Sequence, residues 1–185
     1  MQKALIIGGS AGSFQEVIKI LSSLPPNFNL PVLLCMHRLK HVRTGFVEAL
    51  SLKSKLPVSE PFDKEPIKPG HAYLAPANYH MYIDVNHKIF LSAEEAVHHS
   101  RPSIDLSFFS AAQCYQDHLT GILLSGANRD GAAGLKSVAD HKGTTIVQDP
   151  KEAEVPVMPQ AALSLFNPTH IMATAQIIDY LKSII

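Results

Sequence analysis

The sequence predicts an α/β fold, a doubly wound and mostly parallel sheet with helices on both faces and a small antiparallel hairpin. Residues 4–7 and 31–37 are continuous apolar runs of strand length, which is typical of strands buried on both faces of a sheet. Helical spacing follows the first run, and the same strand-then-helix order returns in residues 119–140. Because 46% of the 185 residues are hydrophobic, the chain can bury a sizeable core, and we expect one domain over residues 1–185.

In the first half of the chain, a helix is expected after the turn at Gly8-Gly9. Apolar residues recur at helical spacing from Phe14 to Leu21, and Pro25 and Pro26 stop this helix. The further expected elements are a strand at 31–37, a helix at 44–53, a strand at 71–76, and a hairpin of 79–85 with 88–91.

In the second half, Ser103 is expected to cap a helix whose buried face includes Ile104 and Phe108. After it come expected strands at 119–124, 144–147 and 169–172, and expected helices at 132–140, 160–165 and 173–185. Residues 148–159 contain three prolines, which cannot donate to a β-ladder or continue a helix. We therefore expect an irregular loop there, long enough to shape a site.

The composition excludes several classes of function. Sixteen basic residues balance sixteen acidic ones, so there is no electrostatic footprint for nucleic acid or an anionic membrane surface. No apolar run reaches the length of a membrane span, and Gly8 and Gly9 interrupt the N-terminal one too early for a signal peptide. We expect a cytoplasmic protein without membrane insertion. Cys35 and Cys114 are interpreted as core thiols, since no C-x-x-C pair is present.

Ser10 lies in the tight turn between the first strand and the first helix. The flanking glycines let the backbone bend sharply and leave the hydroxyl beside the free N–H groups of the helix start, a place that suits a nucleophile. The alternative is that Ser10 or Ser13 simply caps the helix. A dinucleotide-binding fingerprint would need glycine at both serines, and a P-loop would need a lysine after the glycines, so both are excluded.

Ser10, His37 and Asp130 each fall just past the end of a predicted parallel strand. Because ligands of open α/β sheets bind at the carboxyl ends of strands, we expect these three side chains to lie within hydrogen-bond reach of one another. A histidine at a strand end, or an aspartate before Gly131, could equally have a purely structural role. Together the three favour an acyl-transfer site with nucleophile, base and orienting acid in an unusual sequence order.

Five motifs then follow one another along the chain. They are Gly8-Gly9-Ser10-Ala11-Gly12, Met36-His37, Arg101-Pro102-Ser103-Ile104-Asp105, the run from Ser125 to Gly134, and Gln148-Asp149 with Met158-Pro159. Together they resemble the catalytic domain of the chemotaxis protein-glutamate methylesterases of the CheB type, over essentially the whole chain. The resemblance implies a serine esterase that hydrolyses glutamate methyl esters on chemoreceptor-like proteins, and implies glutamine deamidation as a second activity.

By this resemblance, Ser10 is the nucleophile, His37 the general base and Asp130 the acid that orients it. Backbone N–H groups around Ala11, Gly12 and Ala127 would bind the oxyanion. Met158 and Arg101 are further candidates for the substrate site, although Arg101 could instead anchor a helix start. No metal or other cofactor is expected, because none of the ten histidines shows metal-ligand spacing.

Three functional hypotheses stay open at this point. The first is the methylesterase acting on a methylated receptor; the second is a non-catalytic relative that binds receptors or a methyltransferase; the third is a small-molecule ester or amide hydrolase. The early strands end without the acidic cluster that a phosphorylated receiver domain needs, so we expect no receiver domain within residues 1–185. We accordingly expect either constitutive activity or a regulator acting in trans.

Overall fold

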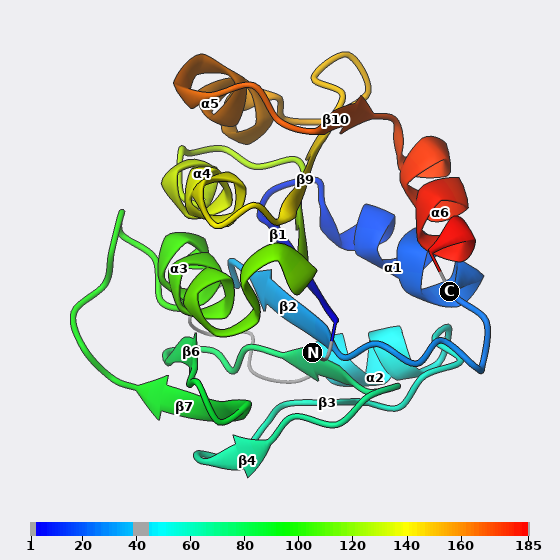
Figure 1. Cartoon of the computed structure of the whole chain (residues 1–185), viewed down its shortest axis with the longest axis vertical. Helices are drawn as coiled ribbons and strands as arrows, with labels where there is room; N and C mark the ends of the chain where they lie inside the picture. The colour runs from blue at the N-terminus through cyan, green and yellow to red at the C-terminus, as the bar shows by residue number, and fades with distance from the viewer. Residues whose placement is uncertain (1–2, 39–44, 185) are drawn as a thin grey trace.

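The computed structural model describes residues 3–38 and 45–184. Its centre is a seven-stranded sheet in which every neighbouring pair is parallel (Figure 1). The strands, in spatial order, are β10 (His170–Met172), β9 (Thr144–Gln148), β8 (Leu119–Leu123), β1 (Ala4–Gly9), β2 (Val32–Met36), β5 (Ala72–Leu74) and β3 (Val58–Ser59). β8, β9 and β10 extend the sheet on one side of β1, and β2, β5 and β3 extend it on the other, which confirms the doubly wound prediction.

Helices cover both faces of this sheet. One layer holds α3 (Ile104–Tyr115), α4 (Ala132–Asp140) and α5 (Val157–Leu165), and the other holds α1 (Phe14–Ser23), α2 (Phe46–Ser51) and α6 (Thr174–Ser183) (Figure 1). Side chains alternate across β1, so Ile6 enters the core under α3 and Ile7 enters the core under α1. None of the helices in the described ranges is long and apolar enough to cross a membrane.

A second, three-stranded antiparallel sheet packs against α3 and consists of β4 (Glu65–Pro66), β7 (Lys88–Ser92) and β6 (His80–Ile83). The predicted hairpin is therefore present as β6 and β7. Its third strand, β4, was not predicted, because two residues that include a proline carry no alternating pattern.

Several elements differ from the predictions in their boundaries, and one short helix was not predicted. The helix expected at 44–53 is α2, which ends at Ser51; residue 44 lies outside the described residues. A helical turn, the 3₁₀ helix Gln116–His118, links α3 to β8. The loop expected to run to Pro159 ends earlier, because α5 begins at Val157. A proline is tolerated in the first turn of a helix, where the missing N–H would have no intrahelical partner.

Gly8 sets how closely α3 approaches the sheet. A Cβ atom at this position would lie 2.4 Å from Cγ2 of Ile104 and 2.9 Å from Cε2 of Phe108. We expect Gly8→Ala to lower the free energy of unfolding by about 1–3 kcal/mol, because both neighbours are buried and must shift. Urea denaturation measures this. The double variant Gly8→Ala/Ile104→Ala should cost less than the sum of the single changes, and full additivity would show that the two residues do not meet.

Candidate active site

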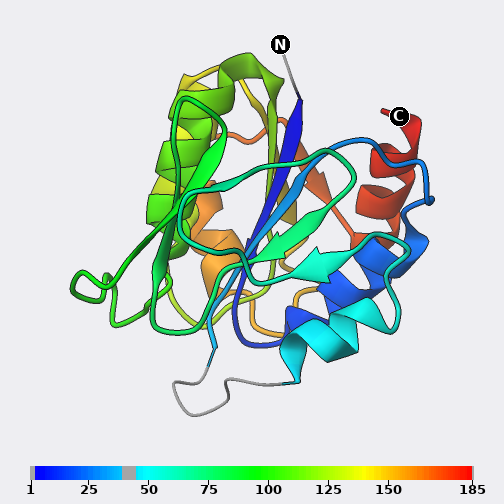
Figure 2. The same ribbon diagram turned by 90° about the horizontal axis from the view of Figure 1, so that it is seen from below.

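β1, β2 and β8 run side by side and leave the sheet at one edge, where the candidate site residues follow them (Figure 2). Ser10 follows β1, and its backbone N–H donates to the carbonyl oxygen of Ser125 at 2.9 Å. The turn continues through Gly12, whose φ of 77° is a left-handed conformation that glycine adopts without strain. Ser13 occupies the N-cap position of α1, but its hydroxyl donates to the carbonyl of Ser10 at 2.6 Å and does not cap the helix.

His37 stands beside Ser10 at the end of the neighbouring strand. The last pair in the register of β1 and β2 is Gly9 with Met36, and the backbone N–H of His37 donates to the carbonyl of Gly9 at 3.1 Å. The residues that follow a paired position in parallel strands remain neighbours. The structure thus places the backbones of Ser10 and His37 next to each other.

Asp130 lies in the loop between β8 and α4, and its side chain is fully buried. One oxygen, Oδ2, accepts from Nε2 of His37 and from the N–H of Ile104, each at 2.7 Å. The other, Oδ1, accepts from the hydroxyl of Ser103 at 3.0 Å and from the N–H of Asp105 at 3.1 Å. The carboxylate therefore sits on the N-terminus of α3, where negative charge is favoured.

Burial and hydrogen bonding act on the pKa of Asp130 in opposite directions. Removal from water would raise it, but the hydrogen bonds from His37 and from the N–H groups of Ile104 and Asp105 outweigh burial and hold the pKa below its ordinary value. Asp130 is therefore ionised at neutral pH. An ionised carboxylate can only accept hydrogen bonds, so the proton of the neutral His37 ring lies on Nε2.

The remaining ring nitrogen of His37, Nδ1, faces Oγ of Ser100 at 3.3 Å. Within residues 3–38 and 45–184, the hydroxyl of Ser10 makes no hydrogen bond to His37 or to any other group. Of the three predicted side chains, the structure thus joins His37 to Asp130 and leaves the Ser10 hydroxyl unbonded beside them.

Backbone donors without an acceptor occur in the two loops that meet at Ser10 and Ser125. Within the described part of the chain, the N–H groups of Ala11, Gly12 and Ala127 donate to no acceptor, and Ala11 and Ala127 are exposed. Ser125 connects their loops, because its hydroxyl donates to the carbonyl of Ala11 at 2.7 Å and its own carbonyl receives the N–H of Ser10. Free N–H groups in this position can stabilise a negative oxygen.

The other two candidates for the substrate site, Arg101 and Met158, are held by the fold. Nη1 of Arg101 donates to the carbonyls of Ala93 and Glu94 at 2.6 and 2.7 Å, and the residue also lines a cavity of about 350 Å³. Met158 is completely buried; its N–H donates to the carbonyl of Gly126 at 3.0 Å, and its side chain fills the space beneath that glycine. It supports the loop that leads to Ala127 from below.

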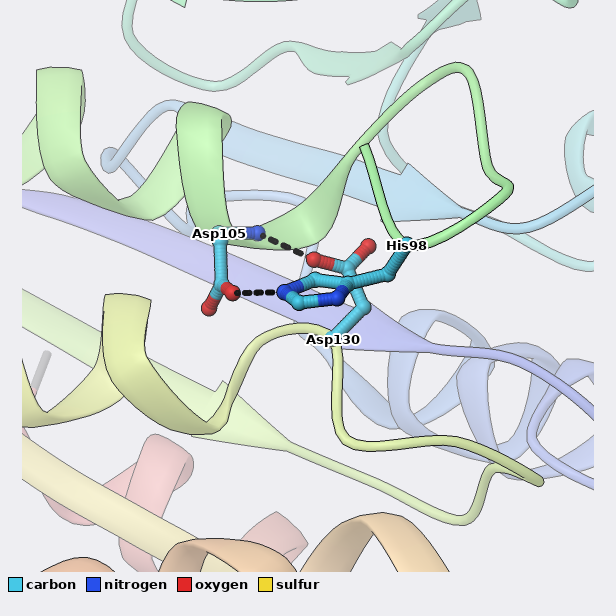
Figure 3. A group of neighbouring side chains, drawn as sticks. All are labelled: His98, Asp105 and Asp130. Atoms are coloured by element: carbon cyan, nitrogen blue, oxygen red, sulfur yellow. Dashed lines mark hydrogen bonds and ion pairs between the residues drawn. The ribbon is translucent and has the colours of Figure 1, made fainter. Parts of the chain in front are cut away.

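A second buried carboxylate, Asp105, belongs to the same network (Figure 3). It lies in the first turn of α3, and its Oδ1 accepts the N–H groups of Gly131 and Gly134 at the start of α4, at 2.9 and 2.7 Å. Asp130, just before α4, in turn accepts N–H groups at the start of α3. Each carboxylate thus caps the other's helix, an arrangement that we call the reciprocal caps.

His98 completes the group drawn in Figure 3, with Nε2 at 3.5 Å from Oδ2 of Asp105. Burial raises the pKa of Asp105, opposed by the N–H groups of Gly134 and Gly131. The ligand atoms of His98, Asp105 and Asp130 lie within 4.8 Å of one another, a spacing compatible with a metal ion. Each carboxylate oxygen, however, already faces an N–H or O–H donor or the His98 ring, so the group is explained as a hydrogen-bond network.

Three residues of this network were not predicted from the sequence as contacts of the catalytic residues. Ser103 was expected only as a helix cap, and it does accept the N–H of Leu106 at 3.4 Å while donating to Asp130. Asp105 has the signature of an acidic residue in a first helical turn, which could have indicated an N-terminal contact. Ser100 has no comparable signal. Both cysteines are free; Cys35 is buried as expected, whereas Cys114 is half-buried and packs against the edge of the core.

The comparison with known proteins identifies relatives along the whole chain. The family model described as CheB methylesterase matches residues 5–181. A relative from Leptospira interrogans is 36% identical over 177 residues, which cover 96% of this chain and 92% of that protein. The Pseudomonas aeruginosa protein named protein-glutamate methylesterase/protein-glutamine glutaminase 3 is 36% identical over 99% of this chain, and the match spans 55% of its own length.

Among solved structures, the crystal structure of the Thermotoga maritima CheB methylesterase catalytic domain superposes with a TM-score of 0.94. It is 27% identical, and the match covers 100% of both chains. The parallel sheet, the small antiparallel sheet and the order of elements therefore match a known catalytic domain. With the family model spanning nearly all of its residues, this chain belongs to the CheB methylesterase family.

Proposed function

We propose that this chain hydrolyses methyl esters of glutamate side chains on a chemoreceptor-like protein, through a covalent intermediate on Ser10. The observation that carries the proposal is the 2.7 Å bond between His37 and the buried Asp130, at the end of the strand next to Ser10. The names of the relatives support the substrate, since curated members of the family are named protein-glutamate methylesterases. A binding module could keep Asp130 for the stability of α3, but it would have no need of a histidine held by that carboxylate beside a serine.

In the proposed first step, His37 acts as the general base. The ionised Asp130 keeps the ring proton on Nε2, so only Nδ1 can accept the proton of the Ser10 hydroxyl. Asp130 also stabilises the imidazolium that forms. Ser10 Oγ then attacks the ester carbonyl carbon and gives a tetrahedral intermediate.

The negative oxygen of that intermediate needs donors that are not already used. The free N–H groups of Ala11 and Ala127 suit this role, and because they belong to the backbone, their alanine side chains do not impair it. The proton on Nδ1 passes to the leaving methoxide, which departs as methanol. A glutamyl ester with Ser10 remains.

In the second half of the reaction, Nδ1 takes a proton from water, and the resulting hydroxide attacks the glutamyl ester. Ser10 leaves with the proton from Nδ1, and the products are free glutamate and the unmodified enzyme. A glutamine side chain passing through the same steps releases ammonia in place of methanol. Exposure of Ala11 and Ala127 leaves this site open to a side chain on the surface of a protein. A regulator acting in trans stays a prediction, since no contact in the described residues bears on it.

The test combines labelling with product detection. A serine-directed fluorophosphonate should label Ser10, and incubation with a methylated receptor fragment should release methanol. Ser10→Ala should abolish both, whereas Ser164→Ala, which removes an exposed hydroxyl on α5, should change neither. Labelling of Ser10 without methanol release would favour the small-molecule hydrolase, and absence of both would favour a non-catalytic binding protein.

A further inference from the structure

The hydroxyl of Ser100 lies at hydrogen-bond distance from Nδ1 of His37, the nitrogen that accepts a proton in the proposed reaction. The hydroxyl oxygen lies 3.3 Å from Nδ1, while Asp130 holds Nε2. This contact has no part in the steps described above. It joins the base to a serine that is 90 residues away from Ser10 in the sequence.

The chemistry of the ring makes this contact exclusive. With its proton on Nε2, the neutral imidazole has one acceptor nitrogen, and that nitrogen carries a single lone pair in the plane of the ring. One lone pair accepts one well-directed hydrogen bond. Ser100 and Ser10 therefore compete for Nδ1. In this structure Oγ of Ser100 lies at hydrogen-bond distance from Nδ1, and the carbonyl of His98, at 3.5 Å, is the second and longer acceptor for the same hydroxyl.

The segment that carries Ser100 is braced on several sides. Val97 and Ser100 exchange two backbone hydrogen bonds, at 3.1 and 2.9 Å, around a turn in which His98 and His99 both have positive φ, 49° and 63°. The next residue, Arg101, is held in place because its guanidinium group donates hydrogen bonds to the carbonyls of Ala93 and Glu94.

Two histidines brace the same segment through their side chains. His80 Nε2 lies 2.9 Å from the carbonyl of Glu95, and His98 rests beside Asp105 at 3.5 Å. These contacts fix the backbone of the segment, and the backbone in turn places Ser100 next to the ring of His37. The position of Ser100 does not depend on the rotation of one free side chain alone.

We propose that Ser100 is a positioning residue that holds His37 in an idle arrangement, so that the base serves Ser10 only when Ser100 releases Nδ1. The proposal rests on the function proposed above, with Ser10 as nucleophile and His37 as base. A hydrogen bond between neutral groups at this distance shifts an equilibrium by about two- to tenfold. Removing the Ser100 hydroxyl should therefore accelerate the reaction of Ser10 by a factor of that size.

The experiment compares valine and threonine at position 100. Their side chains have nearly the same shape, and only threonine keeps the hydroxyl. The rate of fluorophosphonate labelling of Ser10, and kcat/KM for methanol release, should rise about two- to tenfold in Ser100→Val and Ser100→Ala and stay low in Ser100→Thr. Ser92→Ala, at the end of β7, removes a hydroxyl that accepts the N–H of Glu94; it is the matched control and should behave as the unaltered protein.

A spectroscopic measurement reports on the contact directly. The ¹⁵N resonance of His37 Nδ1 should move toward the value of an acceptor without a hydrogen bond in Ser100→Val, while the resonance of Nε2 stays in place. A change that merely loosened the fold would move both resonances and lower the midpoint of thermal unfolding.

Failure of this proposal is distinguishable from failure of the proposed function. Equal or slower labelling of Ser10 in folded Ser100→Val and Ser100→Ala overturns the idle arrangement and leaves the esterase intact. Labelling that survives in Ser10→Ala and maps to Ser100 overturns Ser10 as the nucleophile. Faster labelling in Ser100→Val but not in Ser100→Thr supports competition for Nδ1.

Discussion

Replacing Ser10 or His37 by alanine should each lower kcat for methanol release on the order of 10⁴-fold or more. The two side chains act in a single proton transfer, so once either is gone the other has no partner. The double variant Ser10→Ala/His37→Ala should therefore be scarcely slower than the single variants. Steady-state rates on a methylated receptor fragment, measured for all four proteins, provide the test.

Stability serves as the control for this cycle. The Ser10 hydroxyl has no hydrogen-bond partner within the described residues, so Ser10→Ala should leave the free energy of unfolding within about 0.5 kcal/mol of the original. Losses of rate that multiply in the double variant would contradict a shared mechanism.

Asp130→Ala should lower the free energy of unfolding by about 3–5 kcal/mol, in addition to impairing catalysis. The change leaves the donors of His37, Ser103, Ile104 and Asp105 without their acceptor in a region closed to solvent. Asp130→Asn keeps the size and one acceptor oxygen, so it should cost less in stability. It should also reduce the rate less than Ser10→Ala does, because the ring is still held but the imidazolium loses its charged partner.

The stability difference between the original protein and Asp130→Asn should depend on pH. The pKa of folded Asp130 lies below its ordinary value of 3.8, so its contribution is fully present above that value and is lost as the pH falls through the folded pKa. Asp105 acts in the opposite sense: its pKa is raised, so its contribution is complete at low pH and is lost as the pH rises through the folded pKa.

Urea denaturation at neutral pH and at about pH 3 should therefore show a smaller effect of Asp130→Asn in acid. The control is Asp140→Asn, since Asp140 is exposed and pairs with Lys136 on the surface of α4. It should change stability by less than about 0.5 kcal/mol at either pH. A pH-independent effect of Asp130→Asn would show that its charge does not contribute to stability.

The sequence placed Ser10, His37 and Asp130 at one edge of the sheet for a reason that does not depend on loops. Apolar runs define where parallel strands end, and strand ends meet at a common edge. That rule explains why Ser10 and His37 are neighbours. The bond between His37 and Asp130 also depends on how the loop after β8 runs, and the hydroxyl of Ser10 stays without a hydrogen bond for a reason that the strand ends do not contain.

Ser100 illustrates what sequence patterns cannot locate. Its segment has neither helical nor strand periodicity, and its place is fixed by contacts to distant groups, such as the carbonyls that hold Arg101. Pro159 illustrates the opposite error. Pro159 was expected to end a loop, but it lies in the first turn of α5. The backbone N–H that proline lacks would have no acceptor within the helix at this position, so the helix tolerates it.

The reciprocal caps give Asp130 two independent reasons to be retained during evolution. A lineage that no longer needed the esterase would still be selected to fold, and loss of this carboxylate would leave the N–H groups at the start of α3 and the hydroxyl of Ser103 without their acceptor. No such pressure protects the hydroxyl of Ser10. In a relative of this chain, an aspartate at the Asp130 position is therefore weak evidence for catalysis. The residue at the Ser10 position indicates better whether that relative is an active enzyme.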